Sequence, residues 1–209
     1  MRLSLVGMSG TGKTHWSKQL ESKGFRRFGC DEIIESKLRT ELARSGLPGG
    51  INDVSRWMGQ PYEERYTRNS RRYLELEVEA MEEIFGNFEH EVPPETDLVI
   101  DTTGSVIEVG EPALNRLSSL TTIIYLETPL AVQKEMFKLY HEDPKPVIWG
   151  DRFKKREGES NSKALARCYP ELLAFRSRRF AEIAEVTLDY QRLRSPGFSV
   201  DDFIAIAGK

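Results

Sequence analysis

The sequence predicts an α/β fold in which five parallel strands form a sheet with helices on both faces. Three observations support this prediction. Short apolar runs rich in β-branched residues recur along the chain, longer stretches with helical periodicity separate them, and the first run leads into a glycine-rich loop. Strands that alternate with helices form parallel sheets with right-handed crossovers. The predicted strands cover residues 3–6, 25–29, 98–101, 122–126 and 186–189.

Helical patterns fill the intervals between these strands. In the stretch 31–45, the apolar side chains of Ile33, Ile34, Leu38 and Leu42 recur at helical spacing. This spacing places them on one side of a helix. The predicted helices cover residues 15–23, 31–45, 61–85 (one helix or a pair), 130–140 and 170–185.

Two segments do not fit a minimal α/β sheet. Residues 44–62 contain four glycines and two prolines, and residues 141–163 are polar, basic in the middle and without periodicity. Loops of this length in a compact domain are usually functional or disordered. We expect a substrate-binding insertion over residues 32–75 and a mobile lid over residues 141–163. The alternative is two flexible surface loops, but the apolar cluster Val147, Ile148 and Trp149 argues against it for the lid.

The composition fits one soluble domain that spans residues 1–209, with 39% hydrophobic and 30% charged residues and a net charge of −3. No basic bias indicates nucleic-acid binding, and no apolar run approaches the length of a membrane span or a signal peptide. The two cysteines, Cys30 and Cys168, lie far apart without the spacing of metal ligands. We therefore expect a cytoplasmic protein with no nucleic-acid or membrane partner.

The loop after the first strand matches the phosphate-binding pattern G-x-x-x-x-G-K-[ST], with a strand before it and a helix after it. Glycines let the backbone curl so that successive N–H groups point at phosphate oxygens, and the helix N-terminus adds positive potential. A lysine then reaches the β- and γ-phosphates, and a threonine hydroxyl binds Mg²⁺. The sequence thus predicts a three-layer P-loop NTPase that binds MgATP through Gly7, Ser9, Gly10, Thr11, Gly12, Lys13 and Thr14.

A second candidate for the magnesium site is Asp101, which ends the predicted strand 98–101. An acid at the carboxyl end of a buried strand beside the phosphate loop can hold the water shell of Mg²⁺. The alternative is an aspartate that only ends the strand or caps a helix.

Several motifs decide between classes of P-loop protein. The chain has no N-K-x-D motif of guanine-specific GTPases, and it is short for a motor ATPase. It resembles the shikimate kinase family over most of its length. The family patterns D-x-x-I-E, G-E-x-x-F-R, R-P-L-L and R-x-x-x-Y-x-x-x-A-D correspond here to DEIIE (31–35), GQPYEER (59–65), KPVI (145–148) and RSRRFAEIAE (176–185).

This resemblance implies roles on the acceptor side of the site. Asp31 would bind and deprotonate the acceptor hydroxyl, while Arg65 and Arg176 would hold a substrate carboxylate through their planar guanidinium groups. Gly104 would lie in the substrate loop. Each has a plainer alternative: Asp31 as the N-cap of a helix, Arg176 on a solvated helix face, and other nearby arginines in place of Arg65.

The resemblance also implies roles on the nucleotide side. Lys145 of the lid would stabilise charge on the transferring phosphoryl group, although Arg152 competes for this role. Lys138 and the loop that contains Arg194 and Pro196 would frame the adenine.

The chain departs from the family pattern at positions that shape the acceptor pocket. The family's aspartate two positions before the equivalent of Asp31 is Gly29 here, and the family's triple-glycine loop corresponds to Thr102-Thr103-Gly104-Ser105. These departures suggest a retuned pocket, so that the acceptor could be another polyol or hydroxy acid.

The sequence therefore predicts an ATP- and Mg²⁺-dependent kinase, a monomer or homodimer, that phosphorylates a small hydroxylated substrate, with a shikimate-like acid or polyol most favoured. One alternative is a gluconate or nucleoside monophosphate kinase. Another is a nucleotide-dependent switch without a small acceptor, for which Trp57 and Met58 would be exposed and form a contact surface.

Overall fold

A computed structural model describes residues 1–142 and 145–208 of the chain. Its centre is a parallel sheet of five strands in the order β2-β3-β1-β4-β5. The α/β class and the five parallel strands are confirmed, and the predicted strand ends differ from the observed ones by one residue at most. The strands are β1 (Arg2–Val6), β2 (Arg26–Gly29), β3 (Leu98–Asp101), β4 (Thr122–Leu126) and β5 (Val186–Leu188).

The two faces of the sheet belong to two hydrophobic clusters because side chains alternate along each strand. On β1, Leu3 and Leu5 pack with Trp16 and Phe203 of helices that follow the P-loop and end the chain. Val6 belongs to the larger cluster on the other face, which includes side chains of the helices between residues 30 and 90. Both faces are therefore covered, which explains why β1, β3 and β4 are apolar along most of their length.

Nine helices and two short 3₁₀ turns connect and cover the strands in the described residues. The helices are α1 (Lys13–Ser22), α2 (Cys30–Arg44), α3 (Ile51–Met58), α4 (Glu64–His90), α5 (Glu111–Leu120), α6 (Leu130–Glu142), α7 (Asn161–Ile183), α8 (Tyr190–Leu193) and α9 (Val200–Ala207), with 3₁₀ turns at Val106–Glu108 and Gly150–Arg152.

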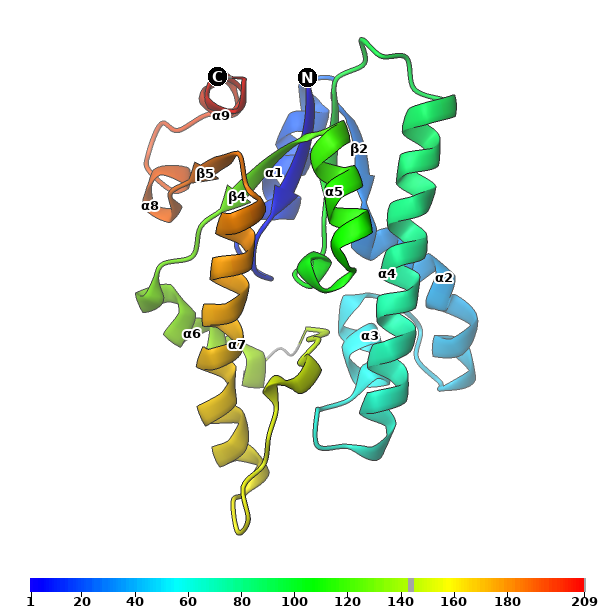
Figure 1. The fold of residues 1–209 in the computed structure, drawn as a ribbon, viewed down its shortest axis with the longest axis vertical. Helices are drawn as coiled ribbons and strands as arrows, with labels where there is room; N and C mark the ends of the chain where they lie inside the picture. The colour runs from blue at the N-terminus through cyan, green and yellow to red at the C-terminus, as the bar shows by residue number, and fades with distance from the viewer. Residues whose placement is uncertain (143–144, 209) are drawn as a thin grey trace.

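Two groups of helices extend beyond the carboxyl ends of the strands (Figure 1). Figure 1 shows α2, α3 and the N-terminal half of α4 together at the lower right, with α6, α7 and the segment that joins them at the lower left. Both chain ends lie at the top of the same view. Because ligands of parallel α/β sheets bind beyond the carboxyl ends of the strands, the site is expected between these two groups of helices.

Several helices differ from the prediction. Helix α7 begins at Asn161 rather than at Pro170, which lies inside the helix, and the hydroxyl of Ser160 caps it by accepting from the Lys163 amide. A proline is favoured in the first turn of a helix, which is why the predicted start was too late. Helices α3, α5, α8 and α9 were not predicted, because short helices between turns carry little periodic signal.

The prediction that a switch protein would expose Trp57 and Met58 is wrong. Trp57 and Met58 are buried, with 7% and 0% of their surface exposed, and both belong to the larger core cluster. Helix α3 directs its apolar side against α2 and α4, so these side chains stabilise the packing of the three helices instead of presenting a partner surface.

No helix in the described part of the chain has the length and apolar character needed to cross a membrane.

The segment predicted as a lid has firm contacts with the core in its first half. Val147, Ile148 and Trp149 are almost fully buried, and Trp149 packs edge-on against Tyr140 and Phe153. Residues 141–142 belong to α6 and residues 161–163 to α7, while residues 143–144 lie outside the described part. Residues 154–158 are exposed.

Candidate active site

The P-loop, residues 7–14, connects β1 to α1 and has the backbone that its glycines permit. Gly12, directly before α1, has a φ of 104°, in the region that residues with a Cβ rarely adopt. Gly7 has a φ of 147°, and a Cβ there would lie 2.9 Å from the carbonyl oxygen of Leu126. The loop therefore curls closely against the end of β4 and directs the N-terminus of α1 toward its concave side.

Lys13 is held within this loop. Its Nζ donates to the carbonyl oxygens of Gly7 and Met8, at 2.9 Å each. Burial lowers the pKa of Lys13, and the carboxylates of Asp101 and Asp31 oppose this effect. The lysine thus lies in the loop as a cation with two nearby acids, in position to move to a phosphate.

Asp101 at the end of β3 accepts two hydrogen bonds on Oδ2, from Ser17 Oγ at 3.1 Å and from Arg27 Nη2 at 3.0 Å. Arg27 also donates from Nε to Ser17 Oγ at 2.8 Å and makes a bidentate contact with Glu32. Sequence reasoning did not identify Arg27, which comes from β2, one strand away from Asp101. This network fixes the carboxylate expected to face the magnesium ion.

Arg27 gives a physical reason for glycine at position 29. A Cβ on Gly29 would lie 2.5 Å from Glu32 Oε2 and 2.9 Å from Arg27 Nη2. Glu32 and Arg27 therefore occupy the space that a side chain at position 29 would need. Glycine at position 29, where the family pattern has aspartate, therefore goes together with the Arg27–Glu32 ion pair beside it.

We expect Arg27→Ala to lower the free energy of unfolding by about 3 kcal/mol, because it leaves the carboxylate of Asp101 buried without its charged partner. The side chains of Arg27 and Asp101 are 8% and 6% exposed, so water can replace the guanidinium only in part. Urea unfolding measures this loss. Arg26→Ala on the exposed neighbour is the matched control, and an equal effect of both changes would contradict the prediction.

Asp31 lies in the first turn of α2, where it is partly buried beside the P-loop. Its Oδ1 accepts a hydrogen bond from the hydroxyl of Tyr73 on α4 at 3.1 Å. Burial raises the pKa of Asp31, and Lys13 and the Tyr73 hydrogen bond counteract this. No side-chain capping bond forms at the start of α2, whose N-cap is Gly29. The carboxylate is thus directed toward Lys13 and α4 and does not serve as the N-cap.

Glu77 is a second acid that sequence reasoning missed, and it is fully buried on α4. Its carboxylate accepts hydrogen bonds from the hydroxyls of Thr103 and of Ser105, the latter at 2.8 Å. Both hydroxyl residues belong to the stretch 102–105, which corresponds to the triple-glycine loop in the resemblance described above. One signal was present in the sequence: Glu77 follows Tyr73 by four residues and lies among apolar positions of the same helix face.

The pKa of Glu77 is raised to about 7, mainly by burial, against the effect of the two hydroxyl donors. Between pH 4.5 and 7 the folded protein therefore holds a proton that the unfolded chain has lost, and stability falls as the pH rises through this window. We expect Glu77→Gln to remove about 2–3 kcal/mol of this pH dependence. Urea unfolding midpoints of both proteins at pH 5 and pH 8 test this prediction. An equal change of the midpoint between the two pH values in both proteins would contradict it.

Arg176 of α7 is also buried at this place, with 4% of its surface exposed. Its Nη2 donates to the carbonyl oxygen of Ile148 at 2.8 Å, and its Nε is buried without a hydrogen-bond partner in the described structure. A Cβ on Gly104 would lie 3.8 Å from Arg176 Nη1 and 3.1 Å from the amide nitrogen of Ser9. Arg176, the loop 102–105 and the P-loop thus meet at one point.

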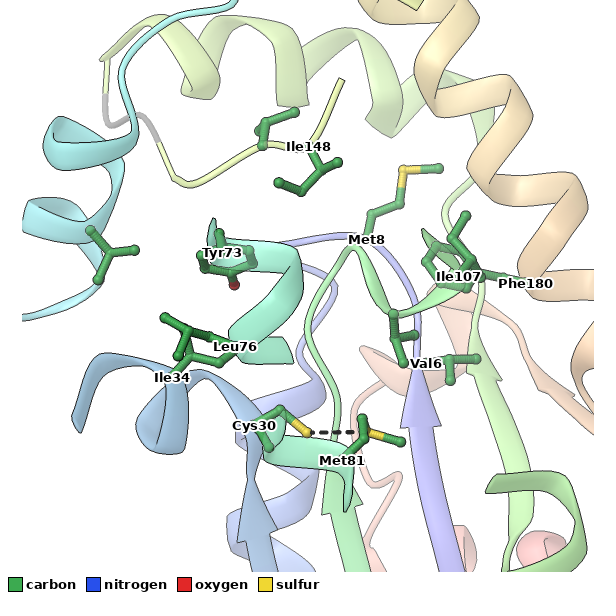
Figure 2. Packing of buried hydrophobic residues seen from close by; sticks show 14 of the residues in the cluster. Val6, Met8, Cys30, Ile34, Tyr73, Leu76, Met81, Ile107, Ile148 and Phe180 are labelled. Carbon is green, nitrogen blue, oxygen red and sulfur yellow. Dashed lines mark hydrogen bonds between the residues drawn. The ribbon is translucent and has the colours of Figure 1, made fainter. Parts of the chain in front are cut away.

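The apolar surroundings of these groups come from every part of the fold. Figure 2 shows Met8 of the P-loop, Ile34 of α2, Tyr73 and Leu76 of α4 and Ile148 in one buried cluster. Such walls lower the local dielectric constant and strengthen the charge interactions inside.

Comparison with solved structures identifies the fold. The chain superposes on a shikimate kinase from Acinetobacter baumannii in complex with shikimate with a TM-score of 0.59 and 21% identity, over 98% of this chain and 89% of that one. The protein has the shikimate kinase fold. The shikimate kinase from Aquifex aeolicus gives 0.55 and 17%, and that from Bacteroides thetaiotaomicron 0.53 and 14%, each over 98% of this chain and 94% of the other. No protein-family model and no curated protein sequence matches the chain.

Within this shikimate kinase fold, a mainly apolar cavity of about 330 Å³ lies beside the tip of the P-loop. Its volume is in the range of small-molecule sites, about 300–1,000 Å³. It lies between α6, α7 and the start of α8, which are near the elements expected to frame the adenine. The residues that line it include Ser9, Gly10, Val132, Met136, Tyr169 and Tyr190.

The residues predicted to frame the adenine are placed differently from one another. Lys138 is exposed on α6 and Pro196 is exposed after α8. Arg194 supports the P-loop, because its Nη2 donates to the Thr11 carbonyl at 3.3 Å and its guanidinium stacks on Tyr190, 3.6 Å from the ring centre. Arg194 thus contacts the P-loop directly and also packs on Tyr190, which lines the cavity.

The cations predicted for the lid and for the acceptor also lie at different places in the structure. Lys145 lines the cavity beside the P-loop tip, and its Nζ donates to Asn52 Oδ1 at 2.6 Å. Arg152 pairs with Glu108 at 3.3 Å and lies over the ring of Phe175. Arg65 is exposed and pairs with Glu63, so the structure does not bring it together with Arg176.

Proposed function

We propose that this protein is an ATP-dependent kinase that transfers the γ-phosphoryl group of MgATP to a hydroxyl group of a small molecule. The observation that carries this proposal is the position of Lys13, held inside the P-loop at 2.9 Å from two backbone carbonyls, with the carboxylate of Asp31 nearby. An anion-binding loop beside a candidate base is what phosphoryl transfer to a hydroxyl requires.

On the nucleotide side, the amides of the P-loop and the N-terminus of α1 would hold the phosphates. Lys13 would exchange its two carbonyl contacts for oxygens of the β- and γ-phosphates. The cavity beside Ser9 and Gly10, with Tyr169 and Tyr190 in its wall, would take the nucleoside. Lys145 in the same wall would neutralise the transferring group, a role that its position supports better than that of Arg152.

The residues present fit a magnesium ion bound together with the nucleotide. Thr14 is exposed at the start of α1, and both hydrogen bonds that the structure gives to Asp101 end on Oδ2. Magnesium is usually held by one or two protein oxygens together with phosphates and water. Thr14 would provide the direct oxygen and Asp101 would hold bound water, and the ion would neutralise charge on the phosphates.

In the transfer step, the acceptor hydroxyl would donate to Asp31, whose raised pKa makes it a stronger base than an exposed aspartate. The acceptor oxygen forms a bond to the γ-phosphorus while the bond from that phosphorus to the bridging oxygen of ADP breaks. The proton of the hydroxyl passes to Asp31, and ADP leaves with the electron pair. The buried segment 147–149 would keep water away from the phosphoryl group.

The test is ADP production by the purified protein with MgATP, with and without candidate acceptors. Acceptor-stimulated ADP release, with a phosphorylated product seen by mass spectrometry, is the expected result. Tight nucleotide binding with no stimulation by any shikimate, gluconate, polyol or nucleoside monophosphate would support a nucleotide-dependent switch instead.

A further inference from the structure

The region around Glu77 holds a network that the mechanism above does not use. Glu77 of α4 accepts hydrogen bonds from the hydroxyls of Thr103 and Ser105, and Thr103 Oγ1 in turn accepts a hydrogen bond from the Ser105 amide at 3.0 Å. The loop 102–105 is therefore tied to the substrate lobe by a fully buried carboxylate.

Under the proposed function, this network would lie beside the acceptor, because it adjoins the residues that hold the candidate base Asp31. Tyr73, which holds Asp31, precedes Glu77 by one helical turn. Gly104, between the two hydroxyl residues, packs against the Ser9 amide of the P-loop. The polarity of the network therefore acts on a ligand that approaches the γ-phosphoryl group.

The direction of the hydrogen bonds restricts what such a ligand can offer. An ionised carboxylate only accepts, so it consumes the protons of both hydroxyls and leaves lone pairs on their oxygens. The carboxylate of Asp31 also only accepts. The part of a ligand that faces this wall must therefore bring hydrogen-bond donors such as hydroxyl groups, and a carboxylate or phosphate group would have to lie elsewhere.

The charges lead to the same conclusion. Arg176 is the arginine that the structure places at this wall, and the carboxylates of Glu108 and Glu77 already face it. Its orphaned Nε needs an oxygen but not a net negative charge. Further arginines of the lobe point outward to acidic partners, such as Arg65 to Glu63 and Arg72 to Glu41. Lys13 already faces Asp101 and Asp31 and would hold the phosphates, so an additional anion would have to share the Arg176 guanidinium with Glu108 and Glu77.

We infer that the acceptor is a neutral polyhydroxylated compound, such as a sugar or cyclitol, and that Glu77 is a positioning residue that sets this preference through Thr103 and Ser105. A hydroxyl group can accept from Arg176 and donate to the wall at once, which a carboxylate cannot do. This inference rests on the proposed kinase function, because it concerns the acceptor pocket of the same site.

Two experiments separate the inference from the proposed function. The first is calorimetric binding to the protein loaded with magnesium and a non-hydrolysable ATP analogue, at pH 8, where Glu77 is ionised because its pKa is about 7. The ligands are neutral sugars and cyclitols, shikimate, gluconate and AMP. We expect neutral polyols to bind more tightly than every anionic ligand. Tighter binding of shikimate, gluconate or AMP, or no binding by any ligand, would overturn the inference.

The second experiment compares Glu77→Gln with Glu75→Gln, which removes a charge from the exposed side of the same helix. The amide of the glutamine donates to one hydroxyl and frees its proton for a ligand. We expect the affinity ratio of neutral to anionic ligands to fall about tenfold or more in Glu77→Gln and to stay unchanged in Glu75→Gln. An unchanged ratio in folded Glu77→Gln would overturn the role of Glu77. ADP production with the same ligands tests the kinase function independently.

Discussion

Replacing Lys13 with alanine should lower acceptor-dependent ADP production by a factor of at least about 10³, because no other group can stabilise the charge on the transferring phosphoryl from inside the P-loop. The lysine is 6% exposed and already positioned by two carbonyl oxygens. Its removal takes away a preorganised cation instead of a flexible surface charge. Turnover at saturating MgATP and acceptor measures the effect.

The control for this change is Lys18→Ala, which removes an exposed lysine from the same helix. It should leave turnover within about twofold of the parent protein, since an exposed charge at this distance is screened. Circular dichroism and thermal unfolding show whether the Lys13 variant keeps its fold. Normal turnover in a folded Lys13→Ala protein would refute the proposed mechanism.

Asp31→Asn should lower kcat by about 10²–10⁴, the usual contribution of a positioned general base, with ATP affinity nearly unchanged. The amide keeps the shape of the side chain and can still accept from Tyr73, but it cannot take a proton. Rapid-quench turnover and a fluorescent ADP analogue measure the two quantities separately.

Tyr73→Phe is the companion to this variant, because it removes only the hydrogen bond that orients Asp31. Its effect on kcat should be roughly tenfold or less, consistent with the loss of one hydrogen bond to a charged group. A parallel loss of ATP affinity and turnover in Asp31→Asn would instead place Asp31 at the nucleotide.

The features that the sequence predicted well are those encoded within a short window. The strand, glycine loop and helix of the P-loop follow one another without interruption, and β3 and β4 were predicted to the residue because buried parallel strands are continuous apolar runs. The start of α7 was missed because a local rule, proline at the first turn, competed with a weaker signal, the serine cap at position 160.

The features that escaped prediction depend on contacts between distant segments. Nothing near Arg27 in the chain shows that it reaches Asp101, 74 residues away. Likewise Glu77 looks like one of many acids on a charged helix until the fold places Thr103 and Ser105 against it. Position 29 and the loop 102–105 are two of the places where the sequence departs from the family pattern, and at both the structure shows charged or polar side chains of other elements.

Tyr66 has a consequence for how motion in this protein could be measured. Its hydroxyl donates to the Val147 carbonyl at 3.0 Å and accepts from the Trp149 amide at 2.7 Å, so one side chain at the start of α4 binds the backbone on both sides of Ile148. Residues 147–149 are thereby linked to α4, while the exposed tip 154–158 is not linked through this side chain. A fluorescent dye attached to the tip would report motion of the tip alone. Trp149, in a protein whose other two tryptophans are replaced, would instead report movement of residues 147–149 together with α4.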